Sequence, residues 1–206
     1  DKSIAQFDRQ SKLSNKISVW HFRANVQYLK AQKLPPNSEE AKKLFLQAGE
    51  DFTRTASLPI SSVIQESGQR EREQELKISS LKLARDAYKR SGDNVKIAEA
   101  SLKFLKQYPL SESALREAVE ALAETGQKDN ALKTIDQALL LNPLNADALI
   151  LRAVTLRQLG EDAEAARQVA FVNILDEKLS RDSSTKFLSD EQSKILKTLM
   201  TEPESK

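Results

Sequence analysis

The sequence predicts an all-α fold built from stacked pairs of antiparallel helices, and three observations predict it. Glycine and proline are scarce, with five and six copies in 206 residues, whereas residue types that favour helices dominate. Three glycines, Gly92, Gly126 and Gly160, follow one another at equal intervals along the chain. Two prolines, Pro109 and Pro143, are separated by the same interval, and each lies half an interval after a glycine.

The two spacings define a unit with a fixed order of parts. Each glycine follows an apolar helical pattern and opens a turn, because glycine readily adopts the left-handed backbone that ends many helices. Each proline lacks an amide N–H and disfavours a helical conformation in the residue before it, so it stops the second helix. Each unit is therefore predicted to run helix, turn, helix, stop.

Composition limits the classes of function. Apolar residues make up 39% of the chain and charged residues 30%, which is enough apolar content for a folded core. Lysine and arginine number 32 against 30 acidic residues, and the net charge of +2 indicates neither a nucleic-acid partner nor an anionic membrane. No apolar run approaches the roughly 20 residues that cross a bilayer, so we expect no membrane insertion by this segment.

Before the repeats, the apolar pattern predicts two helical stretches and a connector. Residues 3–32 form one long helix or two abutting helices with an apolar stripe, and a pair of prolines breaks the pattern after them. Residues 39–56 form the next helix, and residues 57–69 form an irregular or single-turn connector. The charged run 70–76 leads into the first repeat. Residues 1–77 are thus predicted to be an N-terminal helical extension, which could be a degenerate repeat.

A 34-residue period of paired helices resembles the tetratricopeptide repeat (TPR) family, and residues 112–145 carry the resemblance best. With Pro143 at the family's proline position, Gly126 falls on the turn between the two helices. The family's small and large positions are then occupied by Ala131, Ala138, Leu115 and Leu122. Small residues let two helices approach closely, and large ones fill the groove between units. The resemblance implies a right-handed superhelix of antiparallel helix pairs, a TPR-like solenoid.

The two neighbouring units depart from the family pattern. Residues 146–179 have Glu177 where the proline would stop the second helix. Residues 78–111 have Ile97 in place of the small residue of the second helix. Together the three units extend the resemblance over residues 78–179.

The chain after the repeats is predicted to cap them. Residues 180–184 form a polar loop, and residues 189–200 form an amphipathic helix with Ile195, Leu196 and Leu199 facing inward. The tail after that helix is predicted to be disordered. A terminal helix is expected because an uncapped last unit would expose apolar surface. The predicted domains are the extension 1–77, the three repeats 78–179, and the capping helix with its tail 180–206.

The resemblance places partner contacts on the first helix of each unit, which lines the concave face of the superhelix. The predicted partner-binding groove consists of Lys82, Asp86, Lys89, Arg116, Glu117, Glu120, Glu124, Asp147, Ile150, Leu151, Val154 and Arg157. Family members that grip the acidic C-terminus of cytosolic chaperones use lysine and asparagine. Because Asp86 and Glu120 stand where asparagine would be wanted, capture of a chaperone tail is not expected. The alternative for these residues is an ordinary solvated helix face.

No residue pattern points to catalysis. His21 is the single histidine and cysteine is absent, so the usual zinc and iron ligand sets cannot be assembled, and we interpret His21 as structural. Glycines are too far apart for a phosphate-binding loop. Carboxylates alternate with lysine and arginine along the helices, as on solvated faces. We predict that the chain is not an enzyme and holds no metal and no cofactor.

Two hypotheses of function come from different classes. The first is a non-catalytic scaffold that binds a protein or peptide partner in the concave groove. The alternative is a soluble extracytoplasmic accessory domain of a larger bacterial membrane enzyme, of the envelope glycan polymerase or ligase type. The missing initial methionine, the absence of cysteine and the long N-terminal helix motivate it, and they slightly favour a periplasmic or membrane-tethered location over the cytoplasm. Homo-oligomerisation through the irregular N-terminal region, residues 1–70, is a third alternative.

Overall fold

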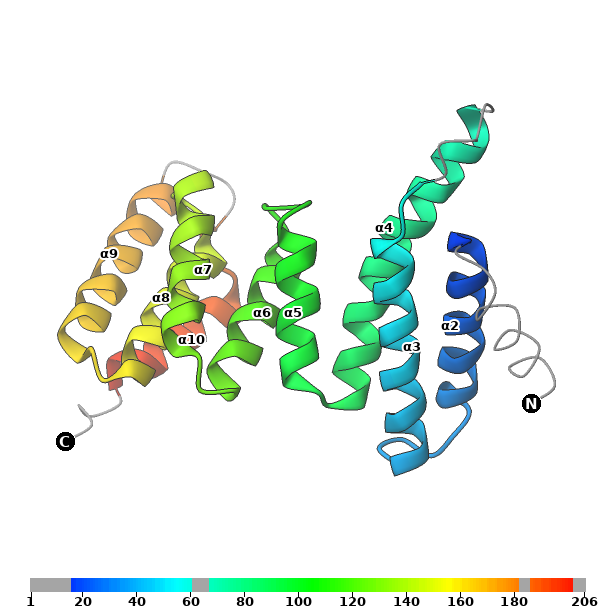
Figure 1. Cartoon of the computed structure of the whole chain (residues 1–206). Coiled ribbons are helices and arrows are strands. Elements are labelled where there is room, and N and C mark those ends of the chain that lie inside the picture. Colours follow the sequence, from blue (N-terminus) through cyan, green and yellow to red (C-terminus); the bar gives the residue numbers. More distant parts are fainter. Residues whose placement is uncertain (1–15, 61–66, 182–185, 202–206) are drawn as a thin grey trace. The chain divides into compact units, whose positions relative to one another are not determined.

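The computed structural model describes residues 16–60, 67–181 and 186–201, and all regular elements in these ranges are α-helices (Figure 1). The helices are α2 Ile17–Gln32, α3 Glu39–Ser57, α4 Ser67–Ser91, α5 Asn94–Leu105, α6 Glu112–Glu124, α7 Lys128–Leu141, α8 Ala146–Leu159, α9 Asp162–Arg181 and α10 Asp190–Thr201. The predicted all-α repeat fold is confirmed. Among these helices, none combines the length and the apolar content that a membrane crossing requires.

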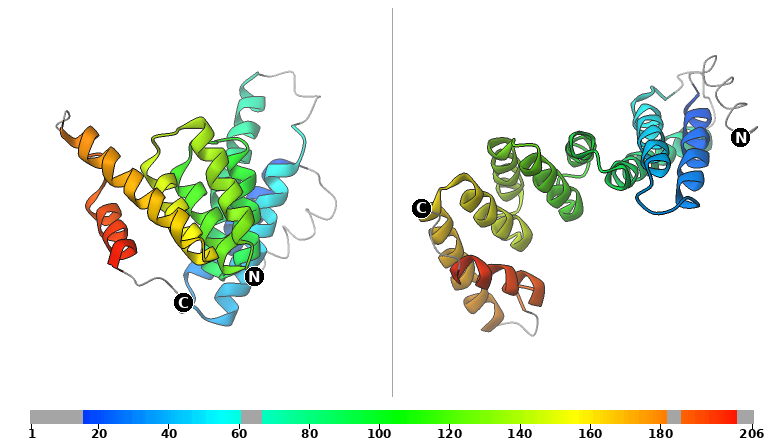
Figure 2. Two further views of the ribbon diagram at one scale, coloured as in Figure 1. Left: turned by 90° about the vertical axis from the view of Figure 1, so that its left-hand side faces the viewer. Right: turned by 90° about the horizontal axis from the view of Figure 1, so that it is seen from below.

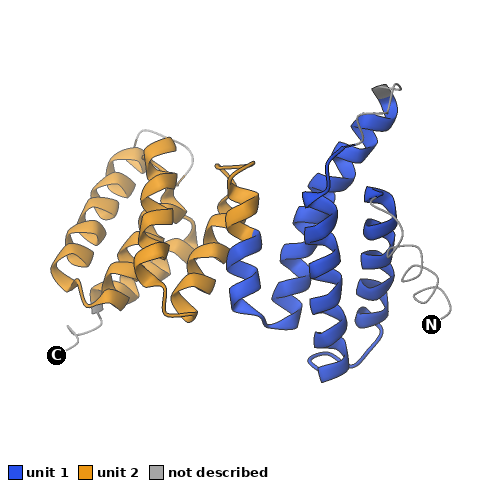
Figure 3. Ribbon diagram, in the orientation of Figure 1, with its two compact units in different colours: residues 1–100 blue, residues 101–206 orange. Residues whose placement is uncertain are grey.

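The chain divides into two compact units, residues 1–100 (unit 1) and residues 101–206 (unit 2), coloured separately in Figure 3. The division falls inside α5. The predicted boundary between residues 77 and 78 falls inside α4, which runs without a break from the charged run into the first repeat. The division into an N-terminal extension, three repeats and a capping segment therefore stays a prediction.

The three turn glycines have the backbone that their spacing predicted. Gly92, Gly126 and Gly160 have φ angles of +77°, +77° and +81°, in the region that favours glycine. The bonds that close the turns repeat as well. The N–H of the residue after Gly126 and after Gly160 bonds to the carbonyl five residues back, at 2.8 and 3.0 Å, which satisfies helix-end carbonyls. The predicted helix-turn-helix units are therefore confirmed.

The prolines stop helices, and where the proline is missing the helix continues. Helix α7 ends two residues before Pro143, and α5 ends four residues before Pro109. In the third unit Glu177 takes the place of proline, and α9 continues through it to Arg181. The prediction of a polar loop beginning at Ser180 is wrong for its first two residues, because nothing at residue 177 stops the helix. The rest of that loop lies outside the described residues.

The N-terminal expectations are met in part. Helix α2 begins at Ile17, and the earlier part of the predicted helix 3–32 lies outside the described residues, as does the tail after residue 201. Helix α3 extends one residue beyond the predicted end. Its N-terminus is capped by Ser38, whose Oγ accepts a hydrogen bond from the Ala41 N–H at 3.3 Å. The last three residues of the predicted connector 57–69 belong to α4.

Unit 1 packs α2 and α4 against α3, and Figure 2 shows α2 alongside α3. Alanines at the contacts, among them Ala24, Ala48 and Ala84, are fully buried, so the helices approach closely. Several polar side chains are buried with hydrogen-bond partners, although Gln27 Oε1 has none among the described residues. Arg23 forms a two-pronged ion pair with Asp51, with its Nε 2.6 Å from Oδ2.

In unit 2, α8, α9 and α10 meet at an apolar cluster. The buried members are Leu149, Ile150, Ala153, Val169, Val172, Leu188, Leu196 and Leu199. Helix α10 contributes the last two, so it covers the end of the third helix pair as a capping helix. The small and large positions of the middle unit, represented by Ala131 and Leu115, are 0% and 2% exposed, as the repeat pattern predicts.

Candidate partner-binding groove

A groove in unit 2 lies between α6, α8 and α10 and has a volume of about 260 Å³. Its apolar lining consists of Val119, Ala123, Ile150, Leu151, Val154 and Ile195. Its polar lining consists of Arg116, Glu120, Asp147, Thr155, Gln158 and Gln192. Small-molecule sites usually measure roughly 300–1,000 Å³, so this groove suits one or two anchoring side chains of a larger partner better than a whole small ligand.

The structure brings together half of the residues predicted for the groove. The predicted residues in its lining are Arg116, Glu120, Asp147, Ile150, Leu151 and Val154. Two other predicted residues of α6 lie elsewhere: Glu117 accepts a hydrogen bond from Ser101 Oγ at 3.4 Å, and Glu124 is exposed at the end of α6. The predicted apolar residues Ile150, Leu151 and Val154 thus line this groove, and partner binding there stays a prediction.

Asp147 holds three helices together at one rim of the groove. Its Oδ1 accepts hydrogen bonds from Arg116 Nη2 on α6, at 2.8 Å, and from Gln192 Nε2 on α10, at 2.7 Å. The Asp147 side chain is 12% exposed. Its hydrogen bond raises the pKa of the Arg116 guanidinium, which secures the positive charge of that group. The Arg116–Asp147 ion pair therefore holds helices together and is also partly exposed at the groove rim.

Arg157, also predicted to contact a partner, binds the other end of α10. Its Nη2 donates a hydrogen bond to the Leu199 carbonyl at 2.5 Å, and its Nη1 lies 3.5 Å from Asp162 Oδ1. A cation at the C-terminal end of a helix satisfies unpaired carbonyls and the helix dipole. Helix α10 is thus held at both ends by residues of α8.

The sequence prediction did not include the contribution of α10 to the groove. Gln192 and Ile195 stand three residues apart on that helix and line the groove together. The amphipathic pattern of the capping helix placed Ile195 on its inner face, but no local signal identifies Gln192, because its partner Asp147 lies 45 residues away.

The predicted groove residues of the first repeat belong to unit 1. Asp86 on α4 accepts hydrogen bonds from the Tyr28 hydroxyl on α2 and from Arg90 Nε, the latter at 2.8 Å. Lys82 and Lys89 are exposed on the same helix. Asp86 therefore joins α4 to the N-terminal helix of its own unit.

The surroundings of His21 agree with a structural role for this residue. Its Nδ1 lies 2.8 Å from Ser80 Oγ in the interior of unit 1, and burial lowers the pKa of its imidazole. In the residues that the structure describes, no group of three histidine, cysteine or acidic side chains is arranged to hold a metal ion.

Comparison with known proteins identifies the family. Residues 19–139 match the sequence family described as "Bacterial transcriptional activator domain". Among solved structures, the TPR2AB-domain:pHSP90-complex of yeast Sti1 is similar, with 13% identity over 98% of this chain and 92% of that chain and a TM-score of 0.42. No curated protein matches the sequence significantly. Because the family match spans more than half of the sequence, this chain, with its TPR-like helix pairs, belongs to the bacterial transcriptional activator domain family.

Proposed function

We propose that this chain is a non-catalytic protein-interaction module of a transcriptional regulator, and that it binds a helix or peptide of a protein partner in the groove of unit 2. The observation that supports the proposal is the lining of that groove. Its lining combines apolar side chains from three helices, which we call the floor, with charged and amide side chains, which we call the rim, and protein interfaces combine the same two kinds of residue. The family supports the regulatory setting.

The apolar floor supplies most of the recognition. Leu151, Val154 and Ile195 are half-buried, so each has apolar surface that a partner can remove from water, at about 25 cal/mol per Å². At the rim, Arg116 and Gln192 already bond to Asp147. Rim charges of this kind affect orientation and association rate more than affinity. A partner with one or two apolar side chains on one face fits this division.

Site-specific photocrosslinking tests the proposal. A photoreactive phenylalanine replaces Gln158, an exposed residue of the groove rim, and in a second protein it replaces Leu140, which is 83% exposed in unit 2 and outside the groove lining. We expect a partner protein to be crosslinked from Gln158 and not from Leu140.

Binding of the purified partner then decides whether the groove carries the interaction. Val154→Glu places a charge on the apolar floor, and Leu140→Glu is the matched control with the same added charge. We expect Val154→Glu to weaken binding about tenfold or more and the control to bind as the wild type. Equal affinity of both variants would show that the partner binds elsewhere.

The assignment as an accessory domain of an envelope enzyme is the weaker candidate. Nothing in the described residues favours it, and the family match favours a regulator. Homo-oligomerisation stays a prediction, and light scattering at high protein concentration tests it.

A further inference from the structure

A second groove of unit 2 lies between α5 and α7, the second helices of two successive repeats. This α5–α7 groove has a volume of about 260 Å³ and shares no lining residue with the groove between α6, α8 and α10. Each of its two walls presents residues at positions i, i+3, i+4 and i+7, which form a single helix face. The walls are Leu102, Leu105, Lys106 and Pro109 from α5 and the turn after it, and Thr134, Gln137, Ala138 and Leu141 from α7; Leu115 of α6 completes the lining.

Apolar side chains at this groove are open to solvent. Leu141 is 60% exposed, and Leu110, which follows the lining residue Pro109, is 65% exposed. Leu115 is 2% exposed and belongs to the buried base of the groove. Residues 67–181 are all described, so the groove has no undescribed neighbour along the chain. A partner side chain in the groove would therefore remove leucine surface from water.

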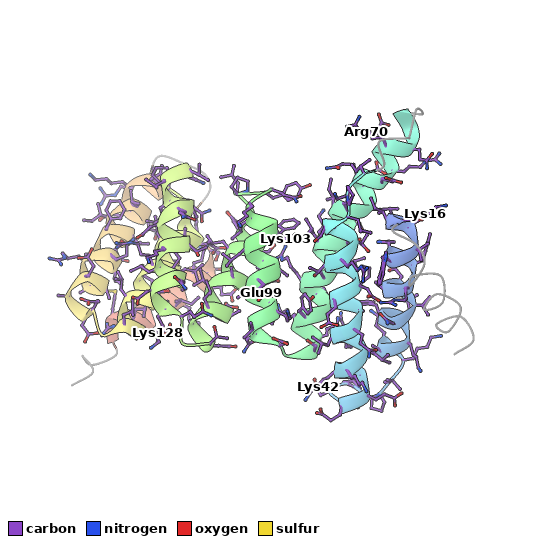
Figure 4. The ribbon with its side chains drawn as sticks, viewed as in Figure 1. Lys16, Lys42, Arg70, Glu99, Lys103 and Lys128 are labelled. Atoms are coloured by element: carbon purple, nitrogen blue, oxygen red, sulfur yellow. The ribbon has the colours of Figure 1, made fainter. Side chains whose placement is uncertain are left out.

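The charges next to these leucines are positive. Lys106 belongs to the lining, and Lys133 stands one turn before Gln137 on the same face of α7. Both lysines are exposed, and the ammonium groups of both are without an ion-pair partner in the described part of the chain. Figure 4 labels two further lysines of these helices, Lys103 on α5 and Lys128 where α7 begins.

Acidic side chains near the groove do not offset these two lysines. Among the lining residues none is acidic, and residues 101–111 contain no aspartate or glutamate. Asp136 of α7 pairs with Arg152 of α8 at 3.0 Å. Glu112 stands in the first turn of α6, where it offsets the positive end of the helix dipole.

The positive charge and the open leucines together select the occupant. In a symmetric pair of this chain the same patch would face itself, and its lysines would repel each other. Carboxylates of another protein would instead complement Lys106 and Lys133 while a leucine-type side chain fills the groove. We propose that the α5–α7 groove is a second docking surface, and that it binds an acidic peptide segment of a partner protein through one or two large apolar side chains. The proposal does not depend on the groove between α6, α8 and α10.

Two peptides test the proposal with the full chain. Both are short helical peptides with two leucines on one face. In one peptide the residues that flank the leucines are glutamate, and in its twin they are lysine. Fluorescence anisotropy of the labelled peptide gives the dissociation constants, at low salt because salt screens surface charges.

The lysines are tested by reversing their charge. We expect the acidic peptide to bind the wild type about fivefold or more tightly than its basic twin. The double variant Lys106→Glu, Lys133→Glu should reverse this preference. The matched control is Lys178→Glu, Lys194→Glu, which changes the net charge equally at exposed lysines outside both groove linings and should keep the preference for the acidic peptide.

The apolar anchor is tested by truncation. Leu141→Ala should weaken binding of the acidic peptide about fivefold or more, because the partner side chain loses its exposed leucine contact. Ile174→Ala shortens a residue that is 50% exposed on α9 and should bind as the wild type. Circular dichroism checks that all variants are equally helical.

Four results would overturn the proposal. They are no binding of either peptide up to about 1 mM, equal binding of both peptides, undiminished binding by the Leu141 variant, and a preference that the Lys106 and Lys133 changes leave unaltered. Light scattering provides a further test. A dimer that dissociates in Leu141→Ala would assign the groove to a second copy of this chain and exclude the acidic partner.

Discussion

Replacing Gly49 by alanine should destabilise unit 1, although the same change usually stabilises a helix. Gly49 lies within α3, and a Cβ there would stand 2.6, 2.7 and 3.0 Å from three ring carbons of Tyr88 on α4. Favourable carbon contacts are about 3.5–4.0 Å. The ring is 3% exposed, burial raises the pKa of Tyr88 to about 12, and its hydroxyl lies 3.1 Å from Thr53 Oγ1. The ring is therefore enclosed and tied at its far end.

The expected magnitude follows from two opposing effects. An extra methyl group in a packed interior costs about 1–3 kcal/mol, and removing a glycine from a helix interior gains about 1 kcal/mol. The free energy of unfolding of unit 1 should therefore fall by about 1 kcal/mol. For a unit of this size that lowers the midpoint of thermal unfolding by about 4–8 °C. Gly68 is the matched control, because a Cβ there meets nothing within 4 Å, and Gly68→Ala should leave the midpoint unchanged or raise it.

Trp20 provides an assay specific to unit 1. It is the single tryptophan of the chain and is 5% exposed inside unit 1, so its fluorescence reports unfolding of that unit, whereas circular dichroism reports both units. We expect the fluorescence midpoint of Gly49→Ala to lie below that of the wild type. A midpoint equal to that of Gly68→Ala, or above it, would show that Tyr88 moves aside at no cost and would refute the argument from close packing.

Three further predictions concern stability. Asp51→Ala leaves the half-buried Arg23 guanidinium, 16% exposed, without this partner and should cost unit 1 about 3–5 kcal/mol in urea unfolding; a loss below about 1 kcal/mol would mean that solvent screens the pair. Gly126→Ala forces a positive φ on a side chain and should cost about 1–2 kcal/mol by circular dichroism, whereas an unchanged midpoint would contradict the turn assignment. Because burial lowers the pKa of His21, the unfolded state binds more protons below about pH 6.5. Unit 1 should therefore lose stability as the pH falls through that region, by at most about 1.4 kcal/mol per pH unit. In His21→Gln, followed by Trp20 fluorescence, this part of the pH dependence should vanish, and its persistence would assign it to other groups.

Local signals were sufficient to predict the repeat units. The conformations of Gly126 and Gly160 depend on one backbone angle that glycine alone adopts freely, so a glycine at the right interval identifies the turn. The effect of a proline on the backbone is equally local, which is why the helix ends near Pro109 and Pro143 were predictable. The end of α9 was not, because the sequence at Glu177 contains no stop signal and the prediction still assumed the length of the other units.

Contacts between distant residues were not predictable from the sequence. Asp86 was assigned to a partner because of its place in the repeat, yet Tyr28, 58 residues earlier, donates a hydrogen bond to it. The partner-binding groove was predicted on α4, α6 and α8 from the repeat positions alone, and only its residues on α6 and α8 line the groove of unit 2. Its third wall, α10, depends on Gln192 reaching Asp147, and neither residue type reveals such a pairing by its neighbours in sequence.

The position of α10 changes how mutations in the groove must be interpreted. Arg116 and Arg157 were predicted to contact a partner, but one bonds to Asp147 and the other to the end of α10. Removing either charge would loosen unit 2 and weaken binding even if the partner never touched it, because a buried polar group would lose its hydrogen bond. Leu151 and Val154 take no part in these polar bonds in the described structure and line the same groove. Loss of binding on changing them, with the unfolding midpoint unchanged, would therefore attribute recognition to the apolar floor, whereas loss on changing the arginines alone would attribute it to the position of α10.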